Sequence, residues 1–155
     1  MGRGLQYLSL TLALLMSMQT LTWAQSNPLA QYRWKNRALL IFAEDAADSD
    51  VRQTRDALQT SACEVADRDI VIGWILSRGE SRLDEARIDA GMADTLRSRL
   101  RVREDEFAAV LVGKDGGVKA RYGQTPDLKE LFALIDGMPM RRSEMRERGL
   151  ECVTD

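Results

Sequence analysis

The sequence contains no histidine. Histidine is the commonest general base near neutral pH and the commonest metal ligand, so its absence excludes Ser-His-Asp and Cys-His catalytic sites and zinc sites built on imidazole. The 155 residues carry 22 basic and 24 acidic side chains, a formal net charge of -2 at pH 7. This balance argues against broad binding of nucleic acids, which is usually the work of basic domains.

Long apolar runs are also scarce, and the one exception lies at the amino terminus. Residues 5–21 are rich in leucine and methionine, follow the basic residue Arg3 and lead into Thr22-Trp23-Ala24. This order is typical of a secretory signal peptide that is cleaved after Ala24. An uncleaved membrane anchor is the alternative, but the run is short and interrupted for a full membrane span.

The leader divides the chain into three predicted segments. They are a signal peptide over residues 1–24, a folded domain over residues 25–148 and a C-terminal tail over residues 149–155. Beyond the leader, no stretch of the sequence is long and apolar enough to cross a bilayer. We therefore expect a periplasmic or secreted protein that is not attached to a membrane after cleavage.

Cysteine occurs only twice, as Cys63 and Cys152. An even number of cysteines in an exported, oxidising setting favours a disulfide, which would close a loop of roughly 90 residues and contribute up to about 4–5 kcal/mol. Two free thiols and a bridge to a partner protein are the alternatives. A catalytic alternative is a thiol-dependent oxidoreductase or peroxidase, with Cys63 attacking and Cys152 resolving, which requires a lowered thiol pKa.

Periodicity predicts four strands and three helices in alternation. The strands are apolar runs at residues 37–43, 69–76, 107–112 and 118–122. The helices run from residues 48–50 to Val65, over residues 92–100 with arginines on the outer face, and from Thr125 to residue 136. Residues 79–91 fit a loop, an irregular strand or a short helix. The order β-α-β-α-β-β-α is that of an α/β, thioredoxin-like three-layer sandwich.

The helix starts are predicted from capping residues. Asp48, Ser49 and Asp50 can each cap the first helix, and Asp50 with Gln53 resembles a capping box. Thr125 followed by proline is typical of the start of the last helix. Cys63 is then expected at or just past the end of the first helix.

Two motifs in the second half of the chain carry a family resemblance. They are residues 112–119 (VGKDGGVK) and residues 132–142 (FALIDGMPMRR), followed by Glu144 and Met145. Through them the chain, over roughly residues 28–148, resembles the domain-of-unknown-function family 4174. The resemblance implies a small exported bacterial protein with a thioredoxin-like domain similar to peroxiredoxins. Related domains occur in sushi-repeat and extracellular-matrix proteins of animals, and no activity is established for the family.

The position of the redox pair of active thioredoxins holds no cysteine here. Between the first strand and the first helix the sequence reads EDAADSD (residues 44–50), and Asp105 and Glu106 stand where such enzymes carry a cis-proline. Without a thiolate there is no nucleophile for disulfide exchange. The four acidic side chains would raise the pKa of a neighbouring thiol.

The remaining candidate sites are charged. Arg141, Arg142, Lys119 and Arg121 form a predicted basic cluster that could dock an anionic partner, either an envelope or extracellular protein or a polyanion; a solvated charged tail is the alternative. Glu44, Asp45 and Asp48 are a weak alternative cation site. Residues 113–117 predict a hairpin turn rather than a phosphate loop.

Together these patterns predict an exported binding module without catalytic activity. We expect no metal, no cofactor and no nucleic-acid partner. The alternative is the thiol-dependent enzyme that uses Cys63 and Cys152.

Overall fold

The computed structural model describes residues 27–148 and residue 152. The strands are β1 (Arg37–Ala43), β2 (Ile70–Leu76), β3 (Ser81–Leu83), β4 (Ala86–Ile88), β5 (Ala108–Val112) and β6 (Val118–Tyr122). The helices are the short 3-10 helix η1 (Ala30–Tyr32), α2 (Ser49–Thr60), α3 (Ala62–Asp67), α4 (Ala90–Leu100), α5 (Leu128–Asp136) and α6 (Pro139–Arg148). None of the helices in this described part of the chain is long and apolar enough to span a bilayer.

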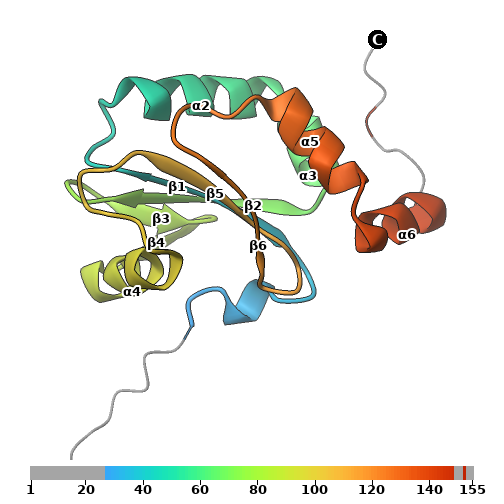
Figure 1. Cartoon of the computed structure of the whole chain (residues 1–155), viewed down its shortest axis with the longest axis horizontal. Coiled ribbons are helices and arrows are strands. Elements are labelled where there is room, and N and C mark those ends of the chain that lie inside the picture. Colours follow the sequence, from blue (N-terminus) through green and yellow to red (C-terminus); the bar gives the residue numbers. More distant parts are fainter. Residues whose placement is uncertain (1–26, 149–151, 153–155) are drawn as a thin grey trace, which may run out of the picture.

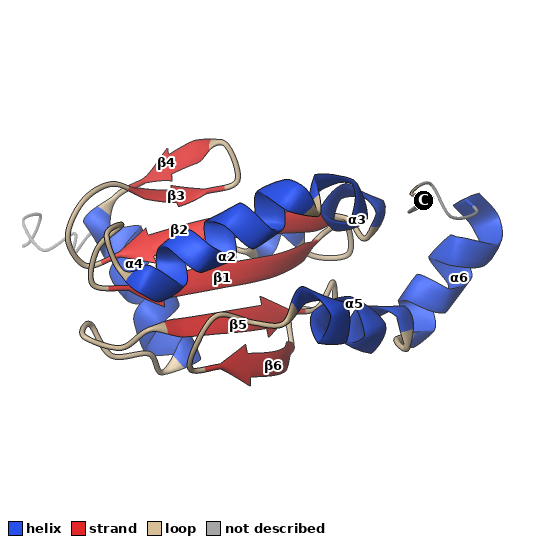
Figure 2. Cartoon of the chain, turned by 90° about the horizontal axis from the view of Figure 1, so that it is seen from above, coloured by secondary structure: helices blue, strands red, loops and turns tan. Residues whose placement is uncertain are grey.

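The strands form one sheet with the order β4-β3-β2-β1-β5-β6. Helix α4 lies on one face of the sheet and α2, α3 and α5 lie on the other, so the molecule has three layers (Figures 1 and 2). Strand β1 pairs in parallel with β2 and antiparallel with β5, and β5 pairs antiparallel with β6. This is the predicted thioredoxin-like sandwich, with β6 at the edge as expected.

Strand β1 is the centre of the fold because it is covered on both faces. All seven of its residues are buried. Alternate side chains enter different cores: Leu40 and Phe42 pack with the α4 side, and Leu39 and Ile41 pack with the α2 and α5 side. Each large apolar side chain buried in this way contributes about 1.5–3 kcal/mol relative to exposure.

The helix starts differ in part from the predicted ones. Asp48, one of the three candidates, caps α2 through its Oδ1, which accepts hydrogen bonds from the backbone N–H groups of Asp50 (2.8 Å) and Val51 (3.3 Å). The Asp50 capping box is wrong. The side chain of Asp50 instead accepts hydrogen bonds from the N–H and the hydroxyl of Thr125, both at 2.7 Å.

Thr125, the predicted cap of the last helix, is also not the residue that caps it. Asp127 caps α5, while Thr125 is bound to Asp50, 75 residues away in the sequence. A carboxylate next to a helix N-terminus stabilises the unpaired N–H groups there more strongly than a hydroxyl that already has another partner.

The segment that the sequence left open, residues 79–91, forms the antiparallel hairpin of β3 and β4. It extends the sheet beyond β2, where Trp74 pairs with Arg82. The other hairpin has the predicted turn: Gly116 has a φ of 83°, and its N–H donates to the carbonyl of Gly113 at 2.8 Å. Only glycine adopts this conformation without steric cost.

Candidate functional site

The β1–α2 loop occupies the position of the thioredoxin redox pair, and its carboxylates have structural partners. The guanidinium of Arg78 lies 3.0 Å from a carboxylate oxygen of Glu44 and 3.0 Å from one of Asp45. The hydrogen bond from Arg78 lowers the pKa of Asp45. Asp48 is turned toward the backbone of α2.

The weak alternative of a cation site at Glu44, Asp45 and Asp48 therefore gains no support. Among residues 27–148 and 152, no three histidine, cysteine, aspartate or glutamate side chains are grouped closely enough to hold a metal ion.

Cys63 and Cys152 form a disulfide with a Cα–Cα distance of 5.9 Å. This bridge decides between the alternatives that the sequence left open. Cys63 lies just past the end of α2, as expected, in the first turn of the short helix α3; the first predicted helix, which was expected to reach Val65, is divided into α2 and α3. Helix α3 lies at the end of the sheet opposite to the β1–α2 loop (Figure 2), so the two sulfur atoms are far from the thioredoxin redox position.

Arg141, the centre of the predicted basic cluster, is not on the surface. It is only 1% exposed. Its guanidinium donates to the backbone carbonyl of Asp67 at 2.7 Å, to the Asp67 carboxylate, and through Nε to Asp136 at 3.1 Å. The prediction that Arg141 belongs to an exposed docking surface is wrong, because its guanidinium binds the buried Asp67 and the half-buried Asp136.

Arg141 belongs to a larger set of charged side chains, which we call the C-terminal ion network. Its members are Arg37, Asp67, Arg68, Asp69, Lys114, Asp136, Arg141, Glu144 and Arg148. Lys114 lies 2.8 Å from Glu144 and 2.7 Å from Asp69. The two motifs that carried the family resemblance therefore meet in space: Lys114 of the first binds Glu144, which follows the second.

The network lowers the pKa values of its carboxyl groups. Partial burial raises the pKa of Asp69, but hydrogen bonds from Arg148 and Lys114 outweigh this effect and bring it from 3.8 down to about 2. Burial likewise raises the pKa of Glu144, and hydrogen bonds from Arg37 and Lys114 lower it to a value below its ordinary one. Asp69 therefore stays ionised well into the acidic range.

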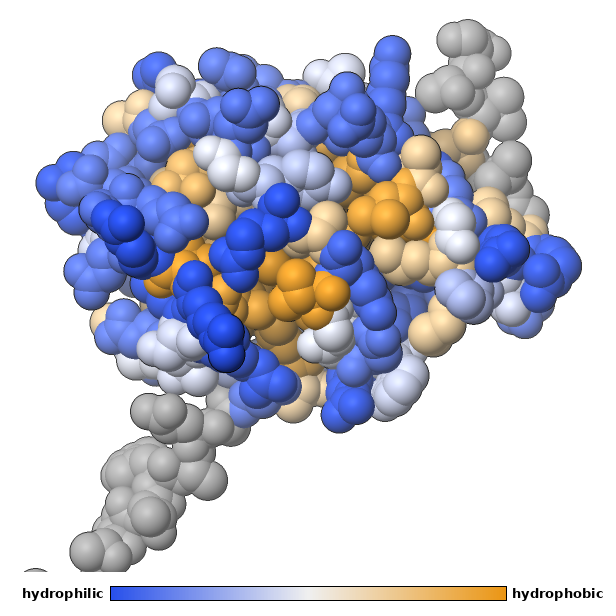
Figure 3. Space-filling model, viewed as in Figure 1, coloured by the Kyte–Doolittle hydropathy of each residue, from blue (hydrophilic) through white to orange (hydrophobic). Residues whose placement is uncertain are grey.

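The other members of the predicted basic cluster have separate surroundings. Arg121 donates a hydrogen bond to the carbonyl of Leu100 at the end of α4. Lys119 pairs with Asp115 at the hairpin turn, 2.6 Å away. Arg142 is exposed on α6. Among the described residues, the exposed large hydrophobic side chains are Trp34, Val118, Leu134 and Met140. In Figure 3 hydrophobic atoms show across the middle of the face and are crossed by long hydrophilic side chains.

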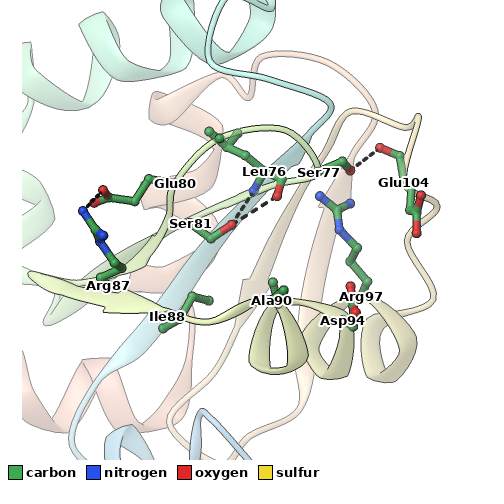
Figure 4. A pocket seen from close by; sticks show the side chains of 12 residues that line it. Leu76, Ser77, Glu80, Ser81, Arg87, Ile88, Ala90, Asp94, Arg97 and Glu104 are labelled. Carbon is green, nitrogen blue, oxygen red and sulfur yellow. Dashed lines mark hydrogen bonds and ion pairs between the residues drawn. The ribbon is translucent and has the colours of Figure 1, made fainter.

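A cavity lies where β2 ends, between the β3–β4 hairpin and α4 (Figure 4). We call it the β2–α4 cavity, and its volume is about 470 Å³. It is lined by Leu76, Ser77, Gly79, Glu80, Ser81, Arg87, Ile88, Ala90, Ala93, Asp94, Arg97 and Glu104. No local pattern in the sequence predicts this cavity, because its walls come from four separate elements.

Arg97 is the buried charge of the β2–α4 cavity. It is 5% exposed, and its guanidinium donates to the carbonyls of Ile75 (2.8 Å), Ala43 (3.2 Å) and Arg103 (3.2 Å). The guanidinium also lies 5.5 Å from the ring centroid of Phe42. Burial lowers the pKa of Arg97, and the charges of Glu104 and Asp94 oppose this effect.

The prediction that the arginines of α4 all face outward is wrong for Arg97. The side chain turns inward and donates hydrogen bonds to the carbonyls of Ala43 and Ile75, near the carboxyl ends of β1 and β2. A spacing pattern along one helix cannot show contacts with segments that are distant in the sequence. The general tendency of α/β folds to bind ligands at the carboxyl ends of their strands is the signal that could have directed attention there.

The family model described as Domain of unknown function (DUF4174) matches residues 28–144. The chain belongs to this family. The DUF4174 match includes both motifs of the C-terminal ion network and ends at Glu144, whose carboxylate joins Arg37 to Lys114.

Three longer animal proteins are similar to this DUF4174 chain. Coiled-coil domain-containing protein 80 of Danio rerio is 27% identical over 148 residues, covering 83% of this chain and 17% of that protein. Sushi repeat-containing protein SRPX2 of Homo sapiens is 27% identical over 123 residues, covering 77% and 26%. Sushi repeat-containing protein SRPX of Rattus norvegicus is 30% identical over 132 residues, covering 81% and 28%. The chain thus spans less than a third of each relative.

A solved structure confirms the fold of this DUF4174 domain. The 2-Cys peroxiredoxin of Plasmodium vivax in its reduced form superposes with a TM-score of 0.54 over 74% of this chain and 84% of that chain, at 13% sequence identity. At this identity the likeness concerns the thioredoxin-like fold alone.

Proposed function

We propose that this protein is an exported binding module that performs no thiol chemistry. One observation carries the proposal: the loop where a thioredoxin-like enzyme holds its nucleophile contains carboxylates and no cysteine. The two cysteines are joined to each other at the other end of the sheet. Disulfide exchange and peroxide reduction both require an accessible thiolate, and the bridged protein has none to offer.

The β2–α4 cavity is the proposed binding site. It lies at the carboxyl end of β2, the edge at which open α/β sheets bind their ligands. Its volume of about 470 Å³ falls within the usual range of small-molecule pockets, roughly 300–1,000 Å³. It also contains a buried charged side chain, Arg97, that can fix the orientation of a ligand.

Export is proposed from two independent features. The predicted signal peptide, residues 1–24, lies outside the described residues, as does the C-terminal tail apart from Cys152. The disulfide supports export, because such bridges persist mainly in oxidising compartments. Expression of the full chain followed by fractionation and intact-mass measurement tests the proposal. We expect an extracytoplasmic chain that begins at Gln25, and a cytoplasmic full-length chain would contradict export.

A paired assay tests the absence of thiol chemistry. The mature protein and its Cys63→Ser, Cys152→Ser double variant are compared in peroxide consumption and in reduction of insulin disulfides, with folding monitored by circular dichroism. We expect equal inactivity of two folded proteins. Cysteine-dependent turnover would overturn the proposal and support the thiol-dependent oxidoreductase or peroxidase. Docking of an anionic envelope partner at the exposed residues Arg142 and Lys119 stays a prediction.

A further inference from the structure

We propose that the β2–α4 cavity binds a small molecule that carries both a carboxylate and an ammonium group, namely a free amino acid or a dipeptide. The inference rests on the proposed function, because it takes the cavity to be the binding site. It is carried by the distribution of charge around Arg97, which differs from that around the other buried basic side chains.

Arg97 lacks a carboxylate partner where comparable residues have one. Four basic side chains are buried in the described part of the chain: Arg37, Arg97, Lys114 and Arg141. Three of them lie close to a carboxylate, at 3.1 Å for Arg37, 2.7 Å for Lys114 and 3.1 Å for Arg141. Arg97 has only carbonyl oxygens. The charges of Asp94 and Glu104 act on Arg97 from beyond ion-pair distance, and a desolvated cation without a close carboxylate is costly, so a ligand carboxylate at this position is favourable.

Arg97 also has donor capacity left for a ligand. Its hydrogen bonds use the two terminal nitrogens, Nη1 and Nη2, and its Nε has no acceptor among the described residues. Nε of Arg97 is not among the buried side-chain atoms that lack a hydrogen-bond partner. In the described residues those atoms are Arg37 Nε and Thr54 Oγ1. Because Arg97 lines the cavity, an entering carboxylate can accept a charge-assisted hydrogen bond from it.

The rim of the cavity supplies the opposite charge. Asp94, on α4, and Glu104, in the loop after it, are exposed and line the cavity with Arg97 (Figure 4). Neither forms an ion pair within 4.0 Å with a basic side chain of the described residues. The remaining charges of the lining, Glu80 and Arg87, pair with each other.

The unpaired set is therefore one buried guanidinium and two exposed carboxylates. Such a set disfavours a simple anion, which Asp94 and Glu104 would repel, and favours a ligand with ammonium groups beside its carboxylate. The apolar part of the wall, including Ile88 and Ala93, can pack against an aliphatic stem. A basic amino acid such as L-lysine has this combination of groups.

A nuclear magnetic resonance titration of the mature protein with L-lysine tests the inference. We expect saturable shifts of backbone amides around the cavity, at Ser77, Gly79, Asp94 and Glu104. L-lysine amide lacks the carboxylate and acetate lacks the ammonium group, so each is expected to bind at least about tenfold more weakly, the loss that corresponds to one charge-assisted hydrogen bond. Equal binding of the three probes, or no shifts with L-lysine, would overturn the inference.

Substitutions locate the site. The Asp94→Asn, Glu104→Gln variant keeps the size of both exposed side chains and is expected to weaken L-lysine binding about tenfold or more. The control is Asp105→Asn, Glu106→Gln, which also removes two negative charges, from the loop that holds Glu104 but outside the cavity lining, and should leave the affinity unchanged. Equal weakening in both variants would indicate a general charge effect and overturn the site.

Arg97→Gln removes the buried guanidinium but risks the fold, since its hydrogen bonds to three backbone carbonyls are lost. If the Arg97→Gln variant does not fold, the Asp94→Asn, Glu104→Gln variant still tests the inference. Failure of the inference also differs from failure of the proposed function: a silent titration with no thiol activity overturns only the ligand assignment, whereas cysteine-dependent turnover overturns the proposed function itself.

Discussion

Arg141 and Arg142 are adjacent arginines on one helix, yet their surroundings differ completely. Arg141 is buried and bound to Asp67 and Asp136, whereas Arg142 is exposed. In the sequence the two side chains form one basic stretch, which favours an anionic partner. The structure divides them between an internal ion pair and the solvent, so one residue type at neighbouring positions has different consequences for stability.

The pair allows a matched test of the C-terminal ion network. Arg141→Ala leaves Asp67 buried with its best partner removed, so we expect the free energy of unfolding to fall by about 3–5 kcal/mol. Arg142→Ala changes an exposed side chain and should stay within about 0.5 kcal/mol of the unsubstituted protein. Urea denaturation at pH 7 measures both, and similar losses in the two variants would contradict the network.

At the scale of elements, the C-terminal part of the chain is attached to the domain in two ways. The ion network binds α6 to the start of β1 through Arg37 and Glu144 and to the β5–β6 hairpin through Lys114. The disulfide binds Cys152 to α3. One attachment depends on charge and the other on redox conditions, so each can be removed without the other.

Reduction is the direct test of the covalent attachment. The bridge joins cysteines 89 positions apart, and a loop of that length corresponds to a loss of about 4–5 kcal/mol on reduction in the chain-entropy model. We expect a lower urea midpoint for the reduced mature protein than for the oxidised one. The Cys63→Ser, Cys152→Ser variant should resemble the reduced protein and not respond to reductant. A midpoint that is independent of reductant in the unsubstituted protein would show that the bridge contributes nothing.

At the scale of the whole molecule, the two ends of the sheet have different roles. The C-terminal ion network and the disulfide lie at the end where β1 begins, and there the charged groups neutralise each other within the protein. The β2–α4 cavity lies at the end where β2 finishes, and there one buried cation and two carboxylates are left for a ligand. The first end stabilises the fold, and the second holds the proposed ligand-binding site.

The ion network also makes global stability depend on acid. The pKa of Asp69 is about 2 in the folded protein and 3.8 without the network. Because the folded value is the lower one, its stabilising contribution is present above about pH 4 and disappears as the pH falls toward 2. We expect the free energy of unfolding to fall over this window, and to fall less in Asp69→Asn, where this group no longer titrates. Denaturation series at several pH values measure the difference, and parallel pH profiles would contradict it.

Much of the fold was predictable because its signals are local. The apolar run of β1 gave the bounds Arg37–Ala43 correctly, and the hairpin turn at Gly116 followed from the conformational freedom of glycine. Residues 79–91 were not assignable, because strands of three residues carry too little periodicity to be told from a loop. The same limit applies to Asp50 and Thr125, which resemble local caps and instead bind each other across 75 positions.

The order of elements, the fold class, the family and the absence of a nucleophile at the redox position can be read from the amino-acid sequence, since each depends on which residue types follow one another. The folded chain was needed to show that Cys63 reaches Cys152, that Arg141 is buried, and that Arg97 lines the same cavity as Asp94 and Glu104. The physical reason is that burial and pairing of charge depend on which distant segments share a low-dielectric space.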